Sequence, residues 1–275
     1  MSNQQKLEIT DNVLYKEYLI RLEANIRYQF GEYLGNNKKH VETFVQQRRN
    51  HERGTAAIDS LKEYVDIENK KLLDIGSGWG ELMFASLVNG ADAYGIEPDT
   101  EEFEISHMLL KSYGLNFDRI KKGVGEKIPY PDNHFDLVTC QNVLEHVQDR
   151  EQTLKEIIRV TKPGGIIWMS VPNYLFPYEG HYRLKWFPLT PKWIGKYILK
   201  ALGRNPEFLM KHVSYTTYPA LMRLWKKNNL EIRNVTEEKI LSGEHKSDMY
   251  SSKLLTTIIL KLKLFPNITW LLKKK

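Results

Sequence analysis

The stretch Leu72-Leu73-Asp74-Ile75-Gly76-Ser77-Gly78-Trp79-Gly80 decides the fold of this chain. A short apolar run that ends in glycines is typical of a buried parallel strand that breaks into a tight turn. Glycine allows the backbone to turn sharply and lets a ligand approach it closely. A helix that begins after the turn, near Glu81, would direct free backbone N–H groups at that ligand. The stretch therefore predicts a turn that holds a nucleotide-like cofactor.

A second predicted strand, Ala93-Tyr94-Gly95-Ile96-Glu97, ends in a carboxylate. An acid about 20 residues beyond a glycine turn is the expected partner of a ribose, because it can accept both hydroxyl protons. Glu97 is therefore the candidate ribose ligand. The turn reads G-x-G-x-G, whereas dinucleotide-binding turns read G-x-G-x-x-G. An NAD-type Rossmann oxidoreductase is the alternative that this difference disfavours.

Helical and strand patterns alternate from residue 55 to Val171. Such alternation predicts an α/β fold, a doubly wound parallel sheet with helices on both faces. Residues 1–54 are expected to form an N-terminal helical extension, because apolar side chains recur at helical spacing between Asn12 and Gln47. Residues 55–275 are expected to form one compact domain, since the whole chain has 275 residues, 41% of them hydrophobic.

A long insert, residues 172–214, follows the predicted fifth strand, 166–171. The insert is too aromatic for disorder, and long connections beyond the carboxyl ends of parallel strands are commonly functional. We interpret it as a substrate cap with short helices, and a homodimer interface is the alternative. Further strands are expected at 230–236 and, because Ile268, Trp270 and Leu272 alternate, at 267–273.

Charge is divided unevenly along the chain. Residues 181–275 carry 19 Lys and Arg against 6 Asp and Glu, a net charge of +13, whereas residues 1–180 carry 21 against 28, a net charge of −7. The basic third is expected to attract an anionic acceptor or to contact a membrane surface peripherally, and a solvated basic face is the alternative. The single cysteine, Cys140, and a polar N-terminus without a signal pattern predict a cytoplasmic protein.

Four blocks of sequence, in order, resemble one known family. They are the glycine turn with its following acid, Gly123-Val124-Gly125-Glu126-Lys127-Ile128-Pro129-Tyr130, the run from Phe135 to Val147, and Arg159-Val160-Thr161-Lys162-Pro163-Gly164-Gly165. Residues 55–173 resemble the class I methyltransferases that use S-adenosylmethionine, in their methyltransferase-11 and ubiquinone-methylase-like branch. The resemblance implies a Rossmann-like, seven-stranded, mostly parallel sheet whose last strand is antiparallel. It also implies that Phe135–Val147 form the fourth strand and the start of a helix.

The resemblance also implies which residues contact S-adenosylmethionine. Asp74 would order the turn and the amino group, Glu97 would bind the ribose, and Pro98 would border the adenine. The full set expected at the cofactor is Asp74, Gly76, Ser77, Gly78, Gly80, Glu97, Pro98, Gly125, Glu126, Gln141 and Asn142. Many relatives carry an aspartate at the position of Val124, where it accepts a bond from the adenine amino group. Here either Glu126 replaces that carboxylate or backbone groups alone recognise the adenine.

Methyl transfer to a hydroxyl usually benefits from a general base, because a hydroxyl is barely acidic. His181, in the aromatic insert, is the first candidate. His146, in Leu-Glu-His-Val after the fourth strand, is the second, although a packing role is its alternative. Histidines do not recur at the spacing of metal ligands such as H-E-x-x-H, so no metal is expected.

The acceptor is expected to be a small molecule or a glycan- or lipid-linked intermediate, and the predicted reaction is O-methylation by in-line displacement. Enzymes that methylate amino groups of nucleic acids resemble one another in an Asn/Asp-Pro-Pro-aromatic motif, where this chain has Cys140-Gln141-Asn142-Val143. Nucleic acid is therefore not the expected partner. A catalytically silent protein that binds S-adenosylmethionine and a partner protein stays an alternative, as does other chemistry of the sulfonium.

Overall fold

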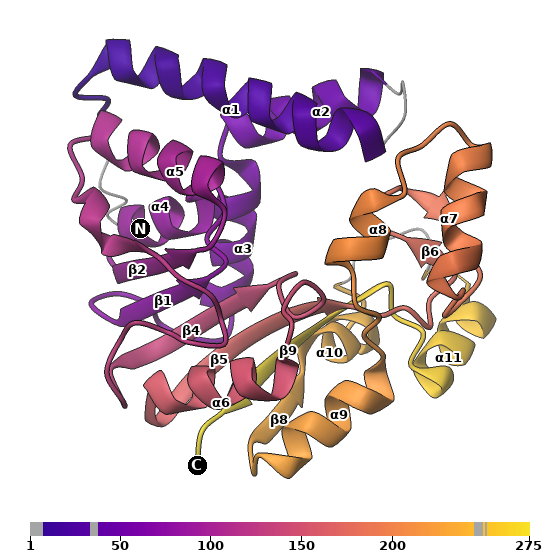
Figure 1. Cartoon of the computed structure of the whole chain (residues 1–275). Coiled ribbons are helices and arrows are strands. Elements are labelled where there is room, and N and C mark those ends of the chain that lie inside the picture. Colours follow the sequence, from indigo (N-terminus) through magenta and orange to yellow (C-terminus); the bar gives the residue numbers. More distant parts are fainter. Residues whose placement is uncertain (1–7, 34–37, 245–249, 251) are drawn as a thin grey trace.

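Seven strands form one sheet in the computed structural model, which describes residues 8–33, 38–244, 250 and 252–275 (Figure 1). Their order across the sheet is β3-β2-β1-β4-β5-β9-β8. The bounds are β1 (Lys71–Ile75), β2 (Asp92–Glu97), β3 (Ile120–Lys122), β4 (Phe135–Gln141), β5 (Thr161–Pro172), β8 (Glu231–Asn234) and β9 (Asn267–Lys273). The first five strands pair in parallel, and β9 is antiparallel to both β5 and β8. The expected mostly parallel sheet is confirmed, and β9 has the bounds that its alternating side chains predicted.

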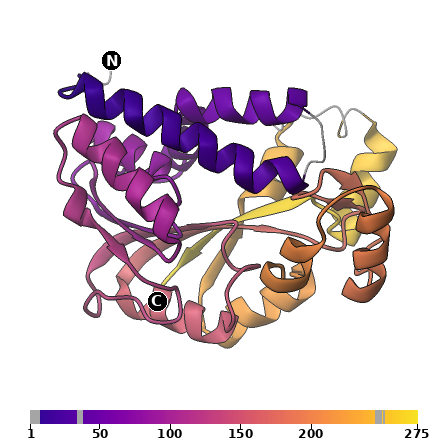
Figure 2. The same cartoon turned by 45° about the horizontal axis from the view of Figure 1, so that its top comes forward.

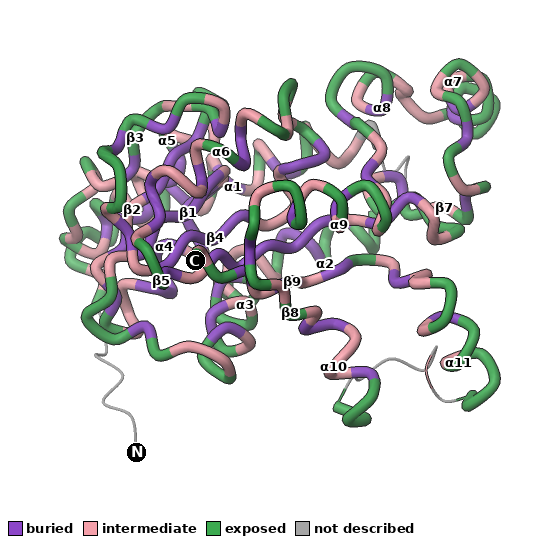
Figure 3. The backbone as a smooth tube through the Cα atoms, turned by 90° about the horizontal axis from the view of Figure 1, so that it is seen from below, coloured by how far each residue is buried: buried purple, intermediate pink, exposed green. Residues whose placement is uncertain are grey.

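Helices cover both faces of the sheet. On one face lie α3 (Glu52–Lys62), α4 (Glu81–Val88) and α5 (Thr100–Ser112), and on the other α6 (Arg150–Val160) and α9 (Tyr218–Lys227) (Figure 1). Successive side chains of a strand point to opposite faces. Leu72 and Leu73 are therefore both fully buried but belong to two different hydrophobic cores. Figure 3 shows the strands as mainly buried and the helices around them as partly buried and partly exposed, as a doubly wound sheet requires.

Two N-terminal helices, α1 (Asn12–Tyr33) and α2 (Lys38–Arg49), lie together along one side of the domain (Figure 2). Tyr18, Leu22 and Ile26 are fully buried in the same core as α3, α4 and α5. The described part of residues 1–54 is thus helical, as the sequence predicted. α3 continues through residue 54 to Lys62, and residues 1–7 lie outside the described part.

The insert folds into a small unit with its own hydrophobic core. It contains a hairpin of β6 (Tyr178–Glu179) and β7 (Leu184–Lys185), then α7 (Lys192–Ala201) and α8 (Glu207–His212). The buried apolar side chains of this unit are those of Tyr174, Tyr182, Trp186, Leu199, Leu209 and Val213. The short helices expected in residues 172–214 are therefore present.

Two expectations about the ends of elements are wrong. The run after β4 is a turn rather than a helix, because Asn142 adopts a left-handed conformation (φ 54°) and α6 begins only at Arg150. The carboxylate of Asp149 caps α6 by accepting the N–H of Gln152. The strand expected at 230–236 ends at Asn234, whose side chain accepts the N–H of Glu237 and so starts α10 (Val235–Leu241).

The remaining elements are a short 3₁₀ turn, η1 (Phe117–Arg119), and α11 (Lys253–Leu262) before β9. Within the described part of the chain, every helix is too short or too polar to cross a membrane.

Candidate active site

A cavity of about 700 Å³ opens beyond the carboxyl ends of β1, β4 and β5. In open parallel sheets this edge is where ligands bind. The lining of the cavity includes the glycine turn after β1, the turn after β4, the insert, and residues of helices α1 to α3. The glycine turn and the insert therefore share one cavity.

The glycine turn forms the floor of the cavity. Gly76, Gly78 and Gly80 have φ values of 68°, 54° and 84°, which side chains with a Cβ rarely adopt. A Cβ on Gly76 would also lie 2.6 Å from Cγ2 of Val143. Gly76, Ser77 and Gly78 line the cavity, whereas Gly80 sits beneath it at the start of α4. The three glycines are thus needed for the backbone path, and the turn is left open to a ligand.

Glu97 lies directly behind this turn at the end of β2. Its two carboxylate oxygens accept the N–H of Gly78 at 2.7 Å and the N–H of Asp99 at 2.8 Å. Burial, followed by the nearby charge of Glu102, raises the pKa of Glu97 to about 8. The two backbone bonds hold the carboxylate against the turn, while Pro98, next in the chain, is exposed.

Asp74 and Gln141 are polar groups at the cavity floor. Asp74, at the end of β1, accepts the hydroxyl of Thr139 at 2.7 Å, and burial raises its pKa to about 7. The side-chain nitrogen of Gln141 is buried and has no hydrogen-bond partner among the described residues. A buried donor without a partner is costly, so a ligand that accepts from Gln141 fits this position. Asn142 also lines the cavity, and its side-chain oxygen accepts a hydrogen bond from the side-chain nitrogen of Asn267 at 3.0 Å.

Gly125 and Glu126 lie outside the cavity wall. Gly125 is buried, and a Cβ there would lie 2.9 Å from Cγ2 of Thr153. One oxygen of Glu126 accepts the N–H groups of Gln148 and Asp149 at 2.7 and 3.3 Å, which stabilises the turn before α6. Because Glu126 is already bonded in this way, it is poorly suited to replace the missing aspartate. The arrangement favours the alternative in which backbone groups recognise the adenine.

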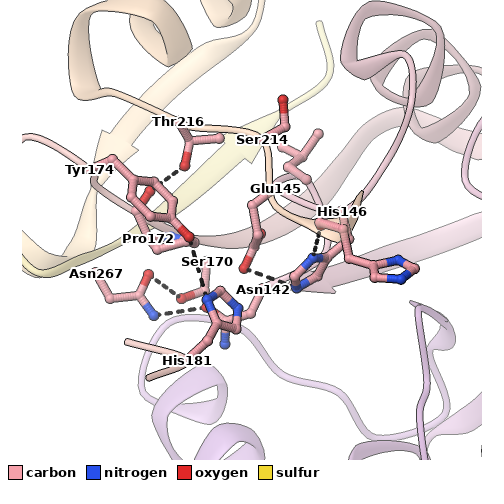
Figure 4. Close-up of polar contacts among 12 residues, drawn as sticks. Asn142, Glu145, His146, Ser170, Pro172, Tyr174, His181, Ser214, Thr216 and Asn267 are labelled. Atoms are coloured by element: carbon pink, nitrogen blue, oxygen red, sulfur yellow. Dashed lines mark hydrogen bonds and ion pairs between the residues drawn. The ribbon is translucent and has the colours of Figure 1, made fainter. Parts of the chain in front are cut away.

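Three titratable side chains that line the cavity lie close together (Figure 4). Glu145 and His146 come from the turn after β4, and His181 comes from the insert. One potential ligand atom of each lies within 4.8 Å of those of the other two. Glu145 is only 1% exposed, and neither of its carboxylate oxygens has a hydrogen-bond partner in the described part of the chain. Burial raises its pKa to about 7.

Hydrogen bonds orient both histidine rings. Nδ1 of His146 lies 2.6 Å from the carbonyl oxygen of His212, which can only accept, so Nδ1 carries the hydrogen. Desolvation by the surrounding protein lowers the pKa of His146 to about 4, although part of the ring is open to the cavity. Nδ1 of His181 lies 2.9 Å from the buried carboxylate of Glu179. Burial lowers the pKa of His181, but the hydrogen bond and charge of Glu179 together with the charge of Glu145 outweigh this effect, and the net shift is upward.

Arginines of the N-terminal helices also line the cavity, and sequence reasoning missed them. Arg48 pairs with the buried Glu81, and its guanidinium lies 4.8 Å from the centre of the Trp79 ring. Arg53 projects into the cavity with no ion pair to a described residue. In the sequence these arginines belong to a polar stretch that looks solvent-exposed, and no motif marks them.

Comparison with known proteins gives the family. Residues 73–169 match a family model described as a methyltransferase domain. The chain is 30% identical over 192 residues to a ubiquinone biosynthesis O-methyltransferase of Saccharophagus degradans. The matched region covers 66% of this chain and 81% of that relative. A protein of the same name from Pseudomonas putida is 30% identical over 206 residues. This match covers 68% of the present chain and 88% of the relative.

Solved structures share the fold. An S-adenosylmethionine-dependent methyltransferase from Mesorhizobium loti superposes with a TM-score of 0.55 at 14% identity, over 78% of this chain and 96% of that one. The YcgJ protein of Bacillus subtilis gives a TM-score of 0.53 at 16% identity, over 81% and 99%. At such identities the likeness concerns the fold alone.

The sheet, the glycine turn and these matches together define an enzyme class: the chain belongs to the class I methyltransferases that use S-adenosylmethionine. Within that class, the two relatives reported above are O-methyltransferases of ubiquinone biosynthesis by name. The NAD-type oxidoreductase considered from the sequence is therefore excluded. The predicted contacts of individual residues with the cofactor stay predictions.

Proposed function

We propose that this enzyme methylates a hydroxyl oxygen of a small-molecule or glycan- or lipid-linked acceptor. The observation that carries the proposal is the single cavity that joins the glycine turn to Glu145, His146 and His181. A hydroxyl must lose its proton as it attacks, and amines or thiolates need no such help. A buried carboxylate beside two imidazoles that are open to the cavity suits a hydroxyl acceptor better than either of these. The names of the relatives agree with this reaction.

The residues at the floor of the cavity fit S-adenosylmethionine. The backbone at Gly76 and Gly78 would contact the methionine and ribose, and Glu97 would accept the ribose hydroxyls. The unpartnered amide of Gln141 and the guanidinium of Arg53 would meet the methionyl carboxylate. When bound, the cofactor would supply an electrophilic methyl group to the acceptor oxygen and leave as S-adenosylhomocysteine with the electron pair of the S–C bond on sulfur. The hydroxyl proton would pass to an imidazole of the cluster.

The other half of the cavity would hold the acceptor. Tyr174 and Phe208 contribute aromatic walls, and Arg183 adds a positive charge that favours an anionic group. A cavity of about 700 Å³ is within the usual size of a small-molecule site. Holding the acceptor oxygen in line with the methyl carbon would supply much of the acceleration.

The chemistry can be tested with a labelled methyl group. The purified protein is incubated with S-adenosylmethionine carrying a ¹³C methyl group and with small molecules and lipids extracted from cells. We expect S-adenosylhomocysteine to accumulate and the label to appear in NMR spectra as a methoxyl carbon. Label on nitrogen, carbon or sulfur would contradict O-methylation. Cofactor binding without any transfer would favour the catalytically silent alternative.

We also propose a peripheral membrane contact, which would suit a lipid-linked acceptor. Helices α7 and α11 lie at the same end of the molecule (Figures 1 and 3), and both carry exposed apolar side chains. They include Trp193, Tyr197, Leu254 and Leu262, and lysines stand beside them. Apolar groups interleaved with lysines are typical of helices that lie in a membrane interface.

Sedimentation with vesicles of anionic phospholipid tests this contact. We expect the wild-type protein to pellet and the variant Trp193→Ser/Leu254→Ser to stay in the supernatant. Val13→Ser/Ile20→Ser is the matched control, because it removes equally exposed apolar groups from α1. Equal pelleting of both variants would contradict the proposed surface.

A further inference from the structure

We propose that Arg183 binds an oxyanion of the methyl acceptor, so that the substrate is a hydroxyl compound carrying a phosphate or a carboxylate rather than a neutral molecule. Arg183 lies in the hairpin of the insert, between β6 and β7, and lines the same cavity as the glycine turn. The inference deepens the proposed function and rests on it for the acceptor hydroxyl. The oxyanion site itself can be tested without methyl transfer.

Arg183 is the cavity arginine that the other assignments leave without a partner. In the described part of the chain, three arginines line the cavity: Arg48, Arg53 and Arg183. Arg48 pairs with Glu81, and Arg53 is the proposed partner of the methionyl carboxylate. The guanidinium of Arg183 has neither an ion pair nor a hydrogen bond to a described residue. Its planar donors are therefore free to bind a second oxyanion in a bidentate manner.

The backbone of Arg183 supplies an independent reason to expect a ligand. Its φ is 51°, in the left-handed region. Glycine and asparagine are the residues that favour this region, and Asn133 and Asn229 adopt it elsewhere in the chain. Strained backbone of this kind clusters at functional sites, where the surrounding structure imposes it. An exposed arginine at such a position in a cavity wall indicates that its side chain serves a ligand.

The preceding residue, Tyr182, imposes this conformation. Tyr182 is fully buried, donates its N–H to Glu179 at 2.7 Å and donates its hydroxyl to the carbonyl of Asn205 at 2.7 Å. The carbonyl of Tyr182, which belongs to the peptide bond before Arg183, accepts a hydrogen bond from Arg204. The peptide unit that leads into Arg183 is thus tied to the core of the insert. The guanidinium is presented from a rigid base.

The charge of the cavity wall suits an anion. Burial lowers the pKa of Arg53 to about 10, and the positive charges of Arg48 and Arg183 contribute to this shift. The guanidiniums nevertheless stay charged at neutral pH, and a bound anion relieves their mutual repulsion. Burial raises the pKa of Asp74 and of Glu145 to about 7, which reduces the negative charge of the wall at neutral pH.

The same hairpin sets the size of the acceptor. Gly180 also lines the cavity, and a Cβ there would meet no atom within 4 Å, so space for a small anion is open along the hairpin. His181 and Arg183 are two residues apart, so their Cα atoms are at most about 7 Å apart. A hydroxyl at His181 and an oxyanion at Arg183 therefore belong to one compact part of the acceptor, on the scale of one or two rings.

Oxyanion binding can be measured without any methyl acceptor. The full chain is saturated with S-adenosylhomocysteine, and inorganic phosphate is titrated in a buffer free of other oxyanions, with binding followed by the phosphorus NMR line width. We expect saturable binding to the wild type and at least tenfold weaker binding to Arg183→Met, which loses charge-assisted hydrogen bonds. Arg183→Lys should bind with intermediate affinity, because it keeps the charge and loses the planar pair of donors.

Arg223→Met is the matched control, because Arg223 is also exposed but lies on α9 and does not line the cavity. It should bind phosphate like the wild type. Arg183→Gly should lose phosphate binding yet melt no lower than the wild type, since glycine accepts a positive φ without strain. Equal phosphate binding in the wild type and Arg183→Met, or no binding in either, overturns the proposal. An Arg183→Gly variant that melts lower and binds phosphate normally would assign Arg183 to the fold instead.

The class of substrate is tested by fractionating the cell extract on an anion-exchange resin at neutral pH before labelled methyl transfer. We expect the acceptor in the retained fraction, and a kcat/KM at least tenfold lower for Arg183→Met, mainly through KM, in a dilution series of that fraction. Treatment with a phosphatase distinguishes the two oxyanions: a phosphate acceptor leaves the retained fraction, and a carboxylate acceptor stays. An acceptor found only in the unretained fraction overturns the proposal.

The two proposals can fail separately. Label on nitrogen of a retained acceptor, with phosphate binding that depends on Arg183, would overturn O-methylation and keep the oxyanion site. Methoxyl product from an unretained acceptor, with phosphate binding unchanged in Arg183→Met, would keep O-methylation and overturn the role of Arg183.

Discussion

Nδ1 of His181 lies 2.9 Å from Oε1 of Glu179, a carboxylate that no solvent reaches. The second oxygen of Glu179 accepts the N–H of Tyr182 at 2.7 Å, so the carboxylate itself is held in place by the insert. This contact orients the His181 ring so that Nε2 is left for the substrate. The position of a reactive nitrogen thus depends on a residue that does not line the cavity.

Replacing Glu179 should therefore affect turnover and leave the cofactor half of the cavity intact. We expect Glu179→Gln to lower kcat with the natural acceptor by roughly 10- to 100-fold, because the ring loses its charged partner. His181→Ala should cost about 10²- to 10⁴-fold. Calorimetric affinity for S-adenosylmethionine should stay at the wild-type value in both variants. A parallel loss of cofactor affinity and thermal stability would show that Glu179 serves packing alone.

Glu97→Ala should weaken cofactor binding selectively. If Glu97 accepts the ribose hydroxyls, each lost charge-assisted bond costs about 1.5–3 kcal/mol, so affinity for S-adenosylmethionine should fall at least tenfold. Isothermal titration calorimetry gives the affinity directly. The control is Glu126→Ala, whose carboxylate is bonded to the turn before α6 and whose loss should leave the affinity near wild type. Wild-type affinity in Glu97→Ala would refute the ribose assignment.

The raised pKa of Glu97 predicts a pH dependence of folding stability. Its pKa lies near 8 in the folded protein and near 4.5 when unfolded, so the folded state binds more protons between these values. Stability contributed by this group is complete below about pH 4.5 and is lost as pH rises toward 8. The free energy of unfolding should therefore fall less steeply from pH 5 to 8 in Glu97→Gln than in the wild type. Denaturant unfolding of both proteins without ligand, repeated across this pH range, measures the change. An equal pH dependence of the free energy of unfolding in the two proteins would contradict the account.

The ion pair between Arg48 and Glu81 should matter to stability as well as to the cavity. Glu81 is 4% exposed, and its other oxygen has no hydrogen-bond partner among the described residues. Arg48→Met leaves this carboxylate buried without a counter-charge, and we expect a loss of about 3–5 kcal/mol in urea unfolding. The double variant Arg48→Met/Glu81→Gln should recover part of that loss. A double variant no more stable than Arg48→Met would contradict this explanation.

The cofactor half of the site was predictable from sequence because its signals are local. Gly76, Gly78 and Gly80 need left-handed backbone, and Glu97 follows at the spacing of a ribose ligand. Alternating apolar residues likewise fixed the bounds of β9 at Asn267–Lys273. These patterns depend on backbone sterics and on the period of a strand, both of which a linear sequence displays.

The other half was not predictable because its residues meet only through the fold. Glu145 and His146 look like part of a helix in sequence, but a left-handed residue at Asn142 turns them into the cavity wall. His181 was found as a candidate, but its partner Glu179 reads as an ordinary charged residue until the hairpin buries it. Arg48 and Arg53 likewise become cavity residues only when α2 and α3 pack over the turn.

The central claim is that the glycine turn and the Glu145–His181 cluster serve one methyl transfer. A crystal structure of the protein with S-adenosylhomocysteine tests it most directly. We predict that the ribose hydroxyls contact Glu97, that the backbone of Gly76 and Gly78 lies against the ligand, and that the sulfur faces Glu145 and His181 across the open cavity. A sulfur directed away from this cluster, or separated from it by protein, would contradict the account.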